Sequence, residues 1–197
     1  MAQVLKEEIR EKILDSALNE FYEKGYKGAT MQGIARKSGI PTGLIYSYYK
    51  NKEDLLTHVV SPVIMISDSL FSETLSHGES ADNLFGNEIP KIIRMLSQYN
   101  RQFIILIDKS QGSSLVKIKD QIIEEVARHL KQIHFLKNTR FEEIVYHIFA
   151  TNFMEGMFEI ARHYVDEEWA VKVLDILVRQ HLYGISSLEE QNNSEDL

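Results

Sequence analysis

The chain has 197 residues with no cysteine, three prolines and ten glycines. The missing cysteine excludes disulfides, thiolate metal sites and cysteine nucleophiles, and the scarcity of proline and glycine favours long helices. Hydrophobic residues make up 44% and charged residues 26%, which is typical of a soluble globular protein. The N-terminus is charged within its first residues and no apolar run is long enough to span a bilayer, so we expect a soluble, cytoplasmic protein.

Charge is distributed unevenly along the chain. The net charge of −7 alone disfavours nucleic acid, because duplex binding depends on neutralising phosphates. However, residues 1–60 carry 9 basic against 8 acidic residues, whereas residues 61–197 carry 13 against 21. One window contains six basic residues and no acidic one: Lys24, Lys27, Arg36, Lys37, Lys50 and Lys52. It indicates either a nucleic-acid footprint or a chance cluster on a solvated face.

Helical periodicity begins near the N-terminus. Leu5–Lys24 has apolar residues at three- and four-residue spacing, which predicts an amphipathic helix, and Gly25 is suited to its C-cap. Thr30 offers a side-chain oxygen to the free N–H groups of a short second helix over Met31–Ser38. Gly39 then ends that helix.

The remaining elements are also predicted as helices. Pro41 fixes the backbone before a third helix over Thr42–Tyr48, and Asn51 can cap a fourth that starts near Lys52. Beyond residue 60, longer helical stretches are separated by polar joints at residues 76–80, 108–114, 137–139 and 166–168. No strand-like alternation is present. The predicted fold class is therefore all-α.

The second and third helices form a predicted helix-turn-helix. This motif needs a small residue where its helices cross, a turn residue that tolerates a left-handed backbone, and an apolar residue that returns to the core. Ala35, Gly39 and Ile45 have these properties at suitable spacing, with Ile34 and Ile40 beside them.

The third helix has the composition of a DNA-contacting surface. If Leu44 or Ile45 and also Tyr49 face the core, the helix exposes Thr42, Gly43, Tyr46, Ser47 and Tyr48. Tyrosine hydroxyls can donate to phosphates and threonine methyls can touch thymine methyls. Taken singly, Tyr46 or Tyr48 is equally compatible with an ordinary half-buried tyrosine.

The ordered motifs over residues 9–58 resemble the tetracycline-repressor (TetR) family of bacterial regulators. The matching segments are Ile13-Leu14-Asp15-Ser16-Ala17, Phe21-Tyr22-Glu23-Lys24-Gly25-Tyr26, Thr30-Met31-Gln32-Gly33-Ile34-Ala35, Ser38-Gly39-Ile40, and Gly43 through Leu55. The resemblance covers about a quarter of the chain. The rest has only the length and helical character of the family.

The resemblance implies roles for particular residues. Tyr46, Tyr48 and Lys52 match positions that contact the DNA backbone. Thr30 and Gln32 match the start of the supporting helix, which also touches DNA. The positions nearest the bases are matched by Thr42, Gly43, Leu44 and Ser47. Pro41 stands where the family has serine and Leu44 where threonine is frequent, so a cap moves or is lost and base preference cannot be transferred.

The helices that follow the helix-turn-helix are predicted to supply a dimer interface and an effector-binding site. Trp169–Ile185 is apolar on more than one face, and Phe141–Tyr164 is similarly broad, so both are either central core helices or, as the resemblance favours, a four-helix interface in a homodimer. A set of aromatic and methionine side chains either forms core or lines a cavity for a small hydrophobic effector: Phe71, Tyr99, Phe103, Phe149, Phe153, Met154, Met157 and Phe158.

Catalytic and metal sites are not indicated. His129 with His134, and Glu159 with His163, have helical spacing, but no third ligand is fixed and a solvated face explains them better. Phosphate-loop, dinucleotide and nucleophile-elbow motifs are absent. We therefore expect no enzyme activity, no catalytic residue, no cofactor and no metal.

These patterns together predict a helix-turn-helix domain over residues 1–52, an effector-binding and dimerisation domain over 53–190, and a disordered tail over 191–197. The predicted function is sequence-specific regulation of transcription, as a homodimeric repressor that binds a palindromic operator in double-stranded DNA and is released by a small apolar effector. The alternative is a helical ligand-binding or adaptor protein without specific DNA binding.

Overall fold

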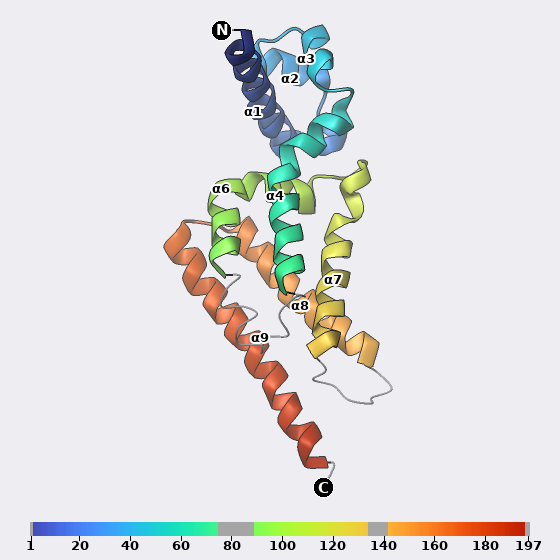
Figure 1. Ribbon diagram of the computed structural model, residues 1–197, viewed down its shortest axis with the longest axis vertical. Helices are drawn as coiled ribbons and strands as arrows, with labels where there is room; N and C mark the ends of the chain where they lie inside the picture. Colours follow the sequence, from blue (N-terminus) through green and yellow to red (C-terminus); the bar gives the residue numbers. More distant parts are fainter. Residues whose placement is uncertain (1, 75–88, 134–141, 196–197) are drawn as a thin grey trace. The chain divides into compact units, whose positions relative to one another are not determined.

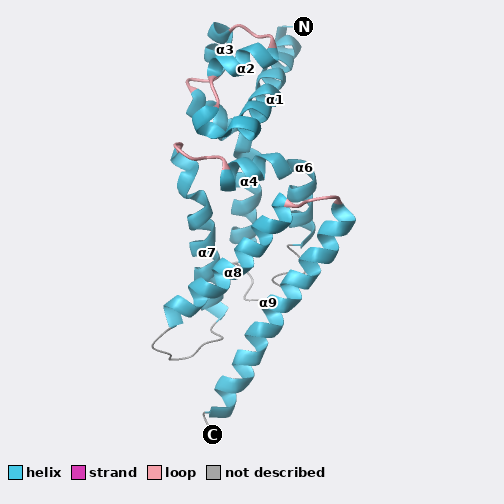
Figure 2. Ribbon diagram, turned by 180° about the vertical axis from the view of Figure 1, so that it is seen from behind, coloured by secondary structure: helices cyan, strands magenta, loops and turns pink. Residues whose placement is uncertain are grey.

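The computed structural model describes residues 2–74, 89–133 and 142–195, and within these ranges every regular element is a helix and none is a strand (Figures 1 and 2). This confirms the all-α prediction. The elements in chain order are α1 (Ala2–Gly28), α2 (Met31–Ser38), α3 (Thr42–Tyr48), α4 (Lys52–Thr74), α6 (Ile89–Asp108), the 3-10 helix η1 (Ser114–Lys117), α7 (Ile118–Ile133), α8 (Glu142–Arg162) and α9 (Glu167–Glu195).

Contacts group the chain into two units. The first contains Met1–Met65 with Tyr99–Ile118, and the second contains Ile66–Gln98 with Lys119–Leu197. Two helices, α4 and α6, therefore contribute to both, and α6 bends where its residues change unit, because Tyr99 has non-helical angles (φ −129°, ψ 23°). The division into residues 1–52, 53–190 and 191–197 is one of function and stays a prediction.

The core of the first unit is built from the apolar stripe of α1. Ile13, Ala17 and Phe21 are fully buried, as the helical spacing predicts. Ile34 of α2 and Ile45 of α3 are also fully buried, so both short helices return an isoleucine to the core. Full burial of such a side chain stabilises the fold by about 1.5–3 kcal/mol.

Local capping chemistry sets the ends of these helices. Gly25 and Gly39 both have positive φ, at 65° and 70°, which a Cβ would strain. The Thr30 hydroxyl accepts from the Gly33 N–H at 2.9 Å, and the Asn51 side-chain oxygen accepts from the Asp54 N–H at 2.8 Å. The predicted helix ends are confirmed at Gly25, Thr30, Gly39 and Asn51. At Pro41 no side chain caps α3, so that cap is lost rather than moved.

Helix α4 continues through Pro62. Proline has no N–H to donate to the carbonyl four residues earlier, here that of His58. The Ser61 hydroxyl donates to this carbonyl at 3.0 Å. A side chain thus replaces the missing backbone hydrogen bond.

The second unit contains the close pair α8 and α9. Ala150 and Ala161 of α8 are buried, and a Cβ built on Gly156 would lie 2.7 Å from the nearer methyl of Leu177. Gly156 therefore permits a close approach of α9 to α8. The buried face of α9 contains Ala170, Leu174, Val178 and His181.

Two expected joints are confirmed, since α6 ends at Asp108 and α9 begins at Glu167. The joints at 76–80 and 137–139 lie outside the described residues. Helix α9 continues to Glu195, and the expected disorder of residues 191–197 stays a prediction. Gln, Asn, Ser and Glu are compatible with a helix, and no proline or glycine follows Gly184 to stop it. No helix in the described ranges is long and apolar enough to cross a membrane.

His181 is the buried histidine of this unit. Its side chain packs against Phe153, with ring centroids 4.6 Å apart, and more distantly against Phe149. Burial lowers the pKa of His181 from its ordinary value near 6.5 to about 4. The imidazole is therefore neutral at pH 7 in the folded protein.

Acid should destabilise the protein through His181. The unfolded chain takes up this proton near pH 6.5 and the folded chain only near pH 4, so stability is lost as pH falls through that window, by up to about 3 kcal/mol. Denaturant unfolding of the wild type and His181→Leu at pH 7.5 and 5 measures it. We expect the wild type to lose more stability than the variant, and equal losses would contradict the assignment.

Candidate DNA-binding surface

Two buried residues anchor α3 to the core of the first unit. Ile45 is fully buried and Tyr49, which follows the helix, is 2% exposed. At the other end the Pro41 carbonyl accepts from the N–H groups of Leu44 at 2.8 Å and Ile45 at 3.2 Å. The opposite face of α3 is thereby turned outward.

Most of the residues predicted to contact DNA are exposed. Leu44 is 40% exposed and Tyr46 50% exposed, so Ile45 is the core-facing residue of the two that the sequence left open. The others divide into two groups: Thr30, Gln32, Gly43 and Ser47 are exposed, and Thr42, Tyr48 and Lys52 are half-buried. The Ser47 hydroxyl donates its hydrogen to the Leu44 carbonyl at 2.7 Å, so toward another partner the hydroxyl oxygen acts as an acceptor.

Lys52 has partners inside the unit. Its ammonium donates to the carbonyls of Tyr26 at 2.7 Å and Ala29 at 2.9 Å, and it lies 4.2 Å from the centroid of the Tyr26 ring. Carbonyls at a helix end lack intrahelical partners and attract cations. Lys52 therefore joins the start of α4 to the end of α1. The sequence signal for this is the early break of α1 at Gly25, which leaves carbonyls to be satisfied.

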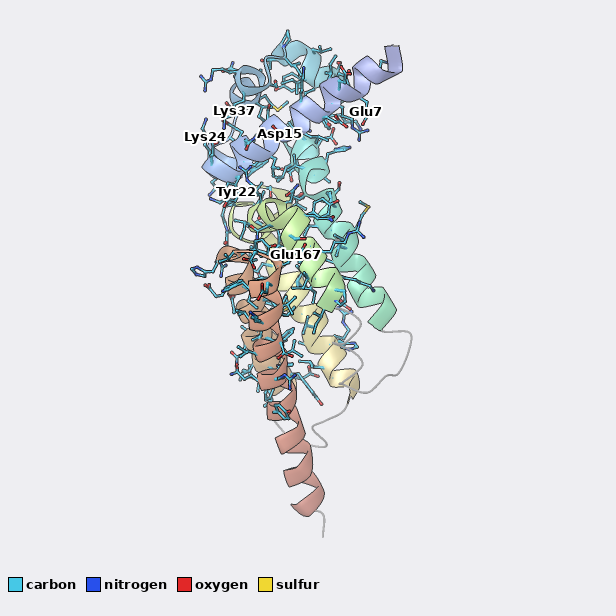
Figure 3. The ribbon with its side chains drawn as sticks, turned by 90° about the vertical axis from the view of Figure 1, so that its left-hand side faces the viewer. Glu7, Asp15, Tyr22, Lys24, Lys37 and Glu167 are labelled. Atoms are coloured by element: carbon cyan, nitrogen blue, oxygen red, sulfur yellow. The ribbon has the colours of Figure 1, made fainter. Side chains whose placement is uncertain are left out.

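A buried carboxylate neutralises part of the basic window. The Glu20 side chain is fully buried and contacts the ammonium groups of Lys24 at 2.6 Å and Lys37 at 3.2 Å. Lys37 also contacts Glu23 at 2.6 Å, and Figure 3 shows Lys24 and Lys37 near one another. Burial raises the pKa of Glu20, but the two lysines outweigh it and hold the pKa below its ordinary value.

Gly33 makes room for that carboxylate. A Cβ at Gly33 would lie 2.3 Å from a carboxylate oxygen of Glu20, so α2 sits on α1 only because this position has no side chain. The basic window thus overstates the charge available to DNA. Arg36 and Lys50, in contrast, are exposed.

The end of α6 and the turn after it also belong to this unit. The Tyr26 N–H donates to the Lys109 carbonyl at 2.8 Å. A Glu53 carboxylate oxygen accepts from the N–H of Ser114 at 2.8 Å and from its hydroxyl at 2.5 Å. Burial and Glu53 raise the pKa of the Tyr26 phenol to about 12. Residues 109–114 are thereby tied to both α1 and α4.

The aromatic residues proposed for an effector site are divided between the units. Phe149 and Phe153 lie one turn apart on α8 and pack against His181, with Met154, Met157 and Phe158 on the same helix. Met157 and Phe158 are buried and Met154 is half-buried. Tyr99 and Phe103 belong to the first unit, and the side chain of Phe71 lies outside the described residues. Their assignment to a ligand stays a prediction.

The candidate metal pair lies at the end of α8. His163, which follows the helix, lies 3.3 Å from Glu159 of α8, and Glu159 also contacts Arg162 at 2.6 Å. His134 lies outside the described residues.

Two short helices joined at a left-handed glycine, with an exposed second helix, define a helix-turn-helix DNA-binding protein. Residues 13–59 match the family model described as bacterial regulatory proteins, tetR family. The chain is 44% identical over 52 residues to the HTH-type transcriptional regulator HbdR of Aromatoleum sp., covering 26% of this chain and 23% of that protein. It is 24% identical over 129 residues to IcaR of Staphylococcus epidermidis, named a negative transcriptional regulator of the biofilm operon, covering 64% and 63%.

Solved structures extend the likeness to the fold of most of the chain. A TetR-like transcriptional regulator from Rhodococcus sp. RHA1 has a TM-score of 0.65 at 17% identity, covering 89% of this chain and 96% of that one. FadR of Bacillus subtilis, solved in complex with stearoyl-CoA, has a TM-score of 0.58 at 18% identity, covering 86% and 97%. The match to the tetR family of bacterial regulatory proteins therefore covers residues 13–59, the chain spans less than two thirds of the length of these curated relatives, and the solved structures show the same fold.

Replacing Lys52 should weaken the fold of the first unit as well as any DNA contact. Lys52→Ala removes two charge-assisted hydrogen bonds and leaves two carbonyls without this donor, so we expect a loss of about 1–3 kcal/mol. Lys50→Ala is the matched control, since Lys50 is exposed. Urea unfolding of both variants measures the difference. Unchanged stability in Lys52→Ala would show that the capping contacts contribute nothing.

Proposed function

We propose that this protein is a sequence-specific transcriptional repressor that binds a palindromic DNA operator as a homodimer and releases it when a small apolar effector binds. The observation that carries the proposal is the orientation of α3, which buries Ile45 and exposes Gly43, Leu44, Tyr46 and Ser47. An exposed helix of seven residues fits the major groove of a duplex.

The exposed residues have different roles in this proposal. Thr42, Gly43, Leu44 and Ser47 lie nearest the bases, where Gly43 permits close approach and Leu44 offers an apolar contact to a thymine methyl. Backbone phosphates are contacted by Thr30, Gln32, Tyr46, Tyr48 and Lys52. For Lys52 this contact adds to its capping of α1, and for Thr30 to its capping of α2.

A homodimer is proposed from the outer surface of α8 and α9. A single short recognition helix buries little surface, so such modules act in pairs on half-sites. Large apolar side chains are exposed on both helices: Ile144 and Ile148 on α8, and Val171, Ile176 and Tyr183 on α9, between 45% and 69% exposed. Water contact at these positions is unfavourable, and a second copy of the chain would cover them.

The effector and the location follow from the same proposal. The aromatic and methionine residues of α8 suit an apolar molecule. FadR of Bacillus subtilis, which has a similar fold, was solved in complex with stearoyl-CoA. The binding of such a molecule would reduce DNA affinity by favouring a different spacing of the paired α3 helices. A repressor that reads chromosomal DNA acts in the bacterial cytoplasm.

Specific DNA binding should depend on Tyr46. We expect the purified protein to prefer the intergenic DNA beside its own gene over random DNA in a gel shift, and Tyr46→Ala to weaken that binding about tenfold by removing an exposed hydroxyl and ring. His163→Ala removes an exposed ring just after α8 and serves as the control. Absence of any sequence preference in the wild type would favour the adaptor alternative.

Dimerisation should depend on Ile176. This side chain is 66% exposed, so Ile176→Glu is tolerated by the fold but places a charge in the proposed interface, which should produce monomers at micromolar concentration. Val165→Glu makes the same change at a side chain that is 67% exposed before α9, and should leave the dimer intact. Sedimentation velocity distinguishes the two, and a monomeric wild type would contradict the proposal.

A further inference from the structure

A hollow of about 600 Å³ opens in the first unit between α1, α3 and the start of α4. Glu7 lies on its rim, at the opposite end of α1 from Lys24 (Figure 3). Its walls come from three places along the chain: Lys6, Glu7 and Arg10 of α1, Leu44, Ser47 and Tyr48 of α3, and then Tyr49 and His58.

The side chains around this hollow are rich in donors. Lys6 and Arg10 are four residues apart and so share a face of α1. Glu7 is the one carboxylate of the lining, and at 4.0 Å its contact with Arg10 is long. The Nδ1 atom of His58 makes a hydrogen bond with the Asp54 carbonyl at 2.8 Å. The hollow therefore has a positive lining.

Tyr49 is the buried residue of this lining. Its side chain is 2% exposed, and its ring lies edge-on to that of His58 with the centroids 5.1 Å apart. Burial raises the pKa of this phenol, and a hydrogen bond and the positive charge of Arg10 partly offset the rise, so the Arg10 cation lies beside the hydroxyl.

We propose that this hollow holds one backbone phosphate of the DNA, beside the bases that α3 reads. This inference rests on the proposed function. Leu44, Ser47 and Tyr48 line the hollow and also belong to the proposed DNA surface, so a duplex lying on α3 covers its mouth. A phosphodiester supplies the negative charge and the acceptor oxygens that suit Lys6, Arg10 and the Tyr48 hydroxyl.

The role of α1 was not visible in the sequence. Lys6 and Arg10 lie outside the acid-free window and alternate with Glu7, Glu8 and Glu11, so local composition shows no positive cluster. In the fold, Lys6 and Arg10 line the hollow with Glu7 as the one carboxylate, whereas Glu8, Glu11 and Lys12 do not line it.

The salt dependence of DNA binding tests the proposal. Fluorescence anisotropy with DNA selected by the wild type from a random pool gives the slope of log affinity against log salt. Lys6→Gln and Arg10→Gln should each reduce that slope by about one and the affinity on the order of threefold to tenfold, without changing sequence preference. Lys12→Gln removes an equal charge from the same helix and should change neither.

Two further measurements locate the contact. Glu7→Gln should act in the opposite direction and raise affinity, because it removes a carboxylate from beside the phosphate. A neutral methylphosphonate placed at successive backbone positions should weaken wild-type binding at one position per half-site. At that position the methylphosphonate should reduce the DNA affinity of the Arg10→Gln variant less than that of the wild type, because the variant has already lost the contact.

The outcomes separate this inference from the function on which it rests. A wild type that selects no DNA sequence would overturn both. Specific binding with slopes for Lys6→Gln and Arg10→Gln equal to that of Lys12→Gln would overturn the phosphate site alone. Saturable binding of inorganic phosphate by the DNA-free protein, lost in Arg10→Gln while the DNA slope stays unchanged, would identify a site for a free anion and also overturn it.

Discussion

The buried carboxylate of Glu20 is the constraint on which the first unit depends. An ionised group taken out of water costs several kcal/mol unless it is paired, and here Lys24 and Lys37 supply the pairing. Lys37 belongs to α2, so the same contact that neutralises Glu20 sets α2 against α1. Gly33 permits the close approach. Because α3 follows α2 after only three residues, the direction in which it points follows from this one buried ion pair.

Three cations of the basic window therefore make contacts that hold the unit together. Lys24 and Lys37 neutralise Glu20, and Lys52 caps the end of α1. The proposed DNA surface relies instead on hydroxyl groups and a glycine, with Lys6 and Arg10 of α1 as added charge. Such a surface carries little net attraction for phosphate, so the fit of α3 to particular bases must supply much of the discrimination.

The elements that the sequence predicted well are those defined by neighbouring residues. The bounds of α2 follow from Thr30 and the left-handed Gly39, and the start of α4 follows from Asn51; the capping contacts of Thr30 and Asn51 each span three residues, and the structure reproduces them. What the sequence did not predict depends on distant partners. Lys52 meets carbonyls 23 and 26 residues away, and the hollow joins side chains separated by half of the first unit. Likewise, the aromatic residues of α8 do not show from spacing whether they face His181 or a ligand.

The acidic character of the chain beyond residue 60 bears on how the protein moves among competing sites. Those residues carry 13 basic against 21 acidic groups and repel a duplex, although solvent ions screen the repulsion beyond about 8 Å at physiological ionic strength. A weakly charged DNA surface, on a chain with this excess of acidic groups, binds random DNA sequence only weakly. We expect brief encounters and frequent return to solution rather than long one-dimensional sliding. Such a regulator stays available at low copy number, since the rest of the chromosome sequesters few of its molecules.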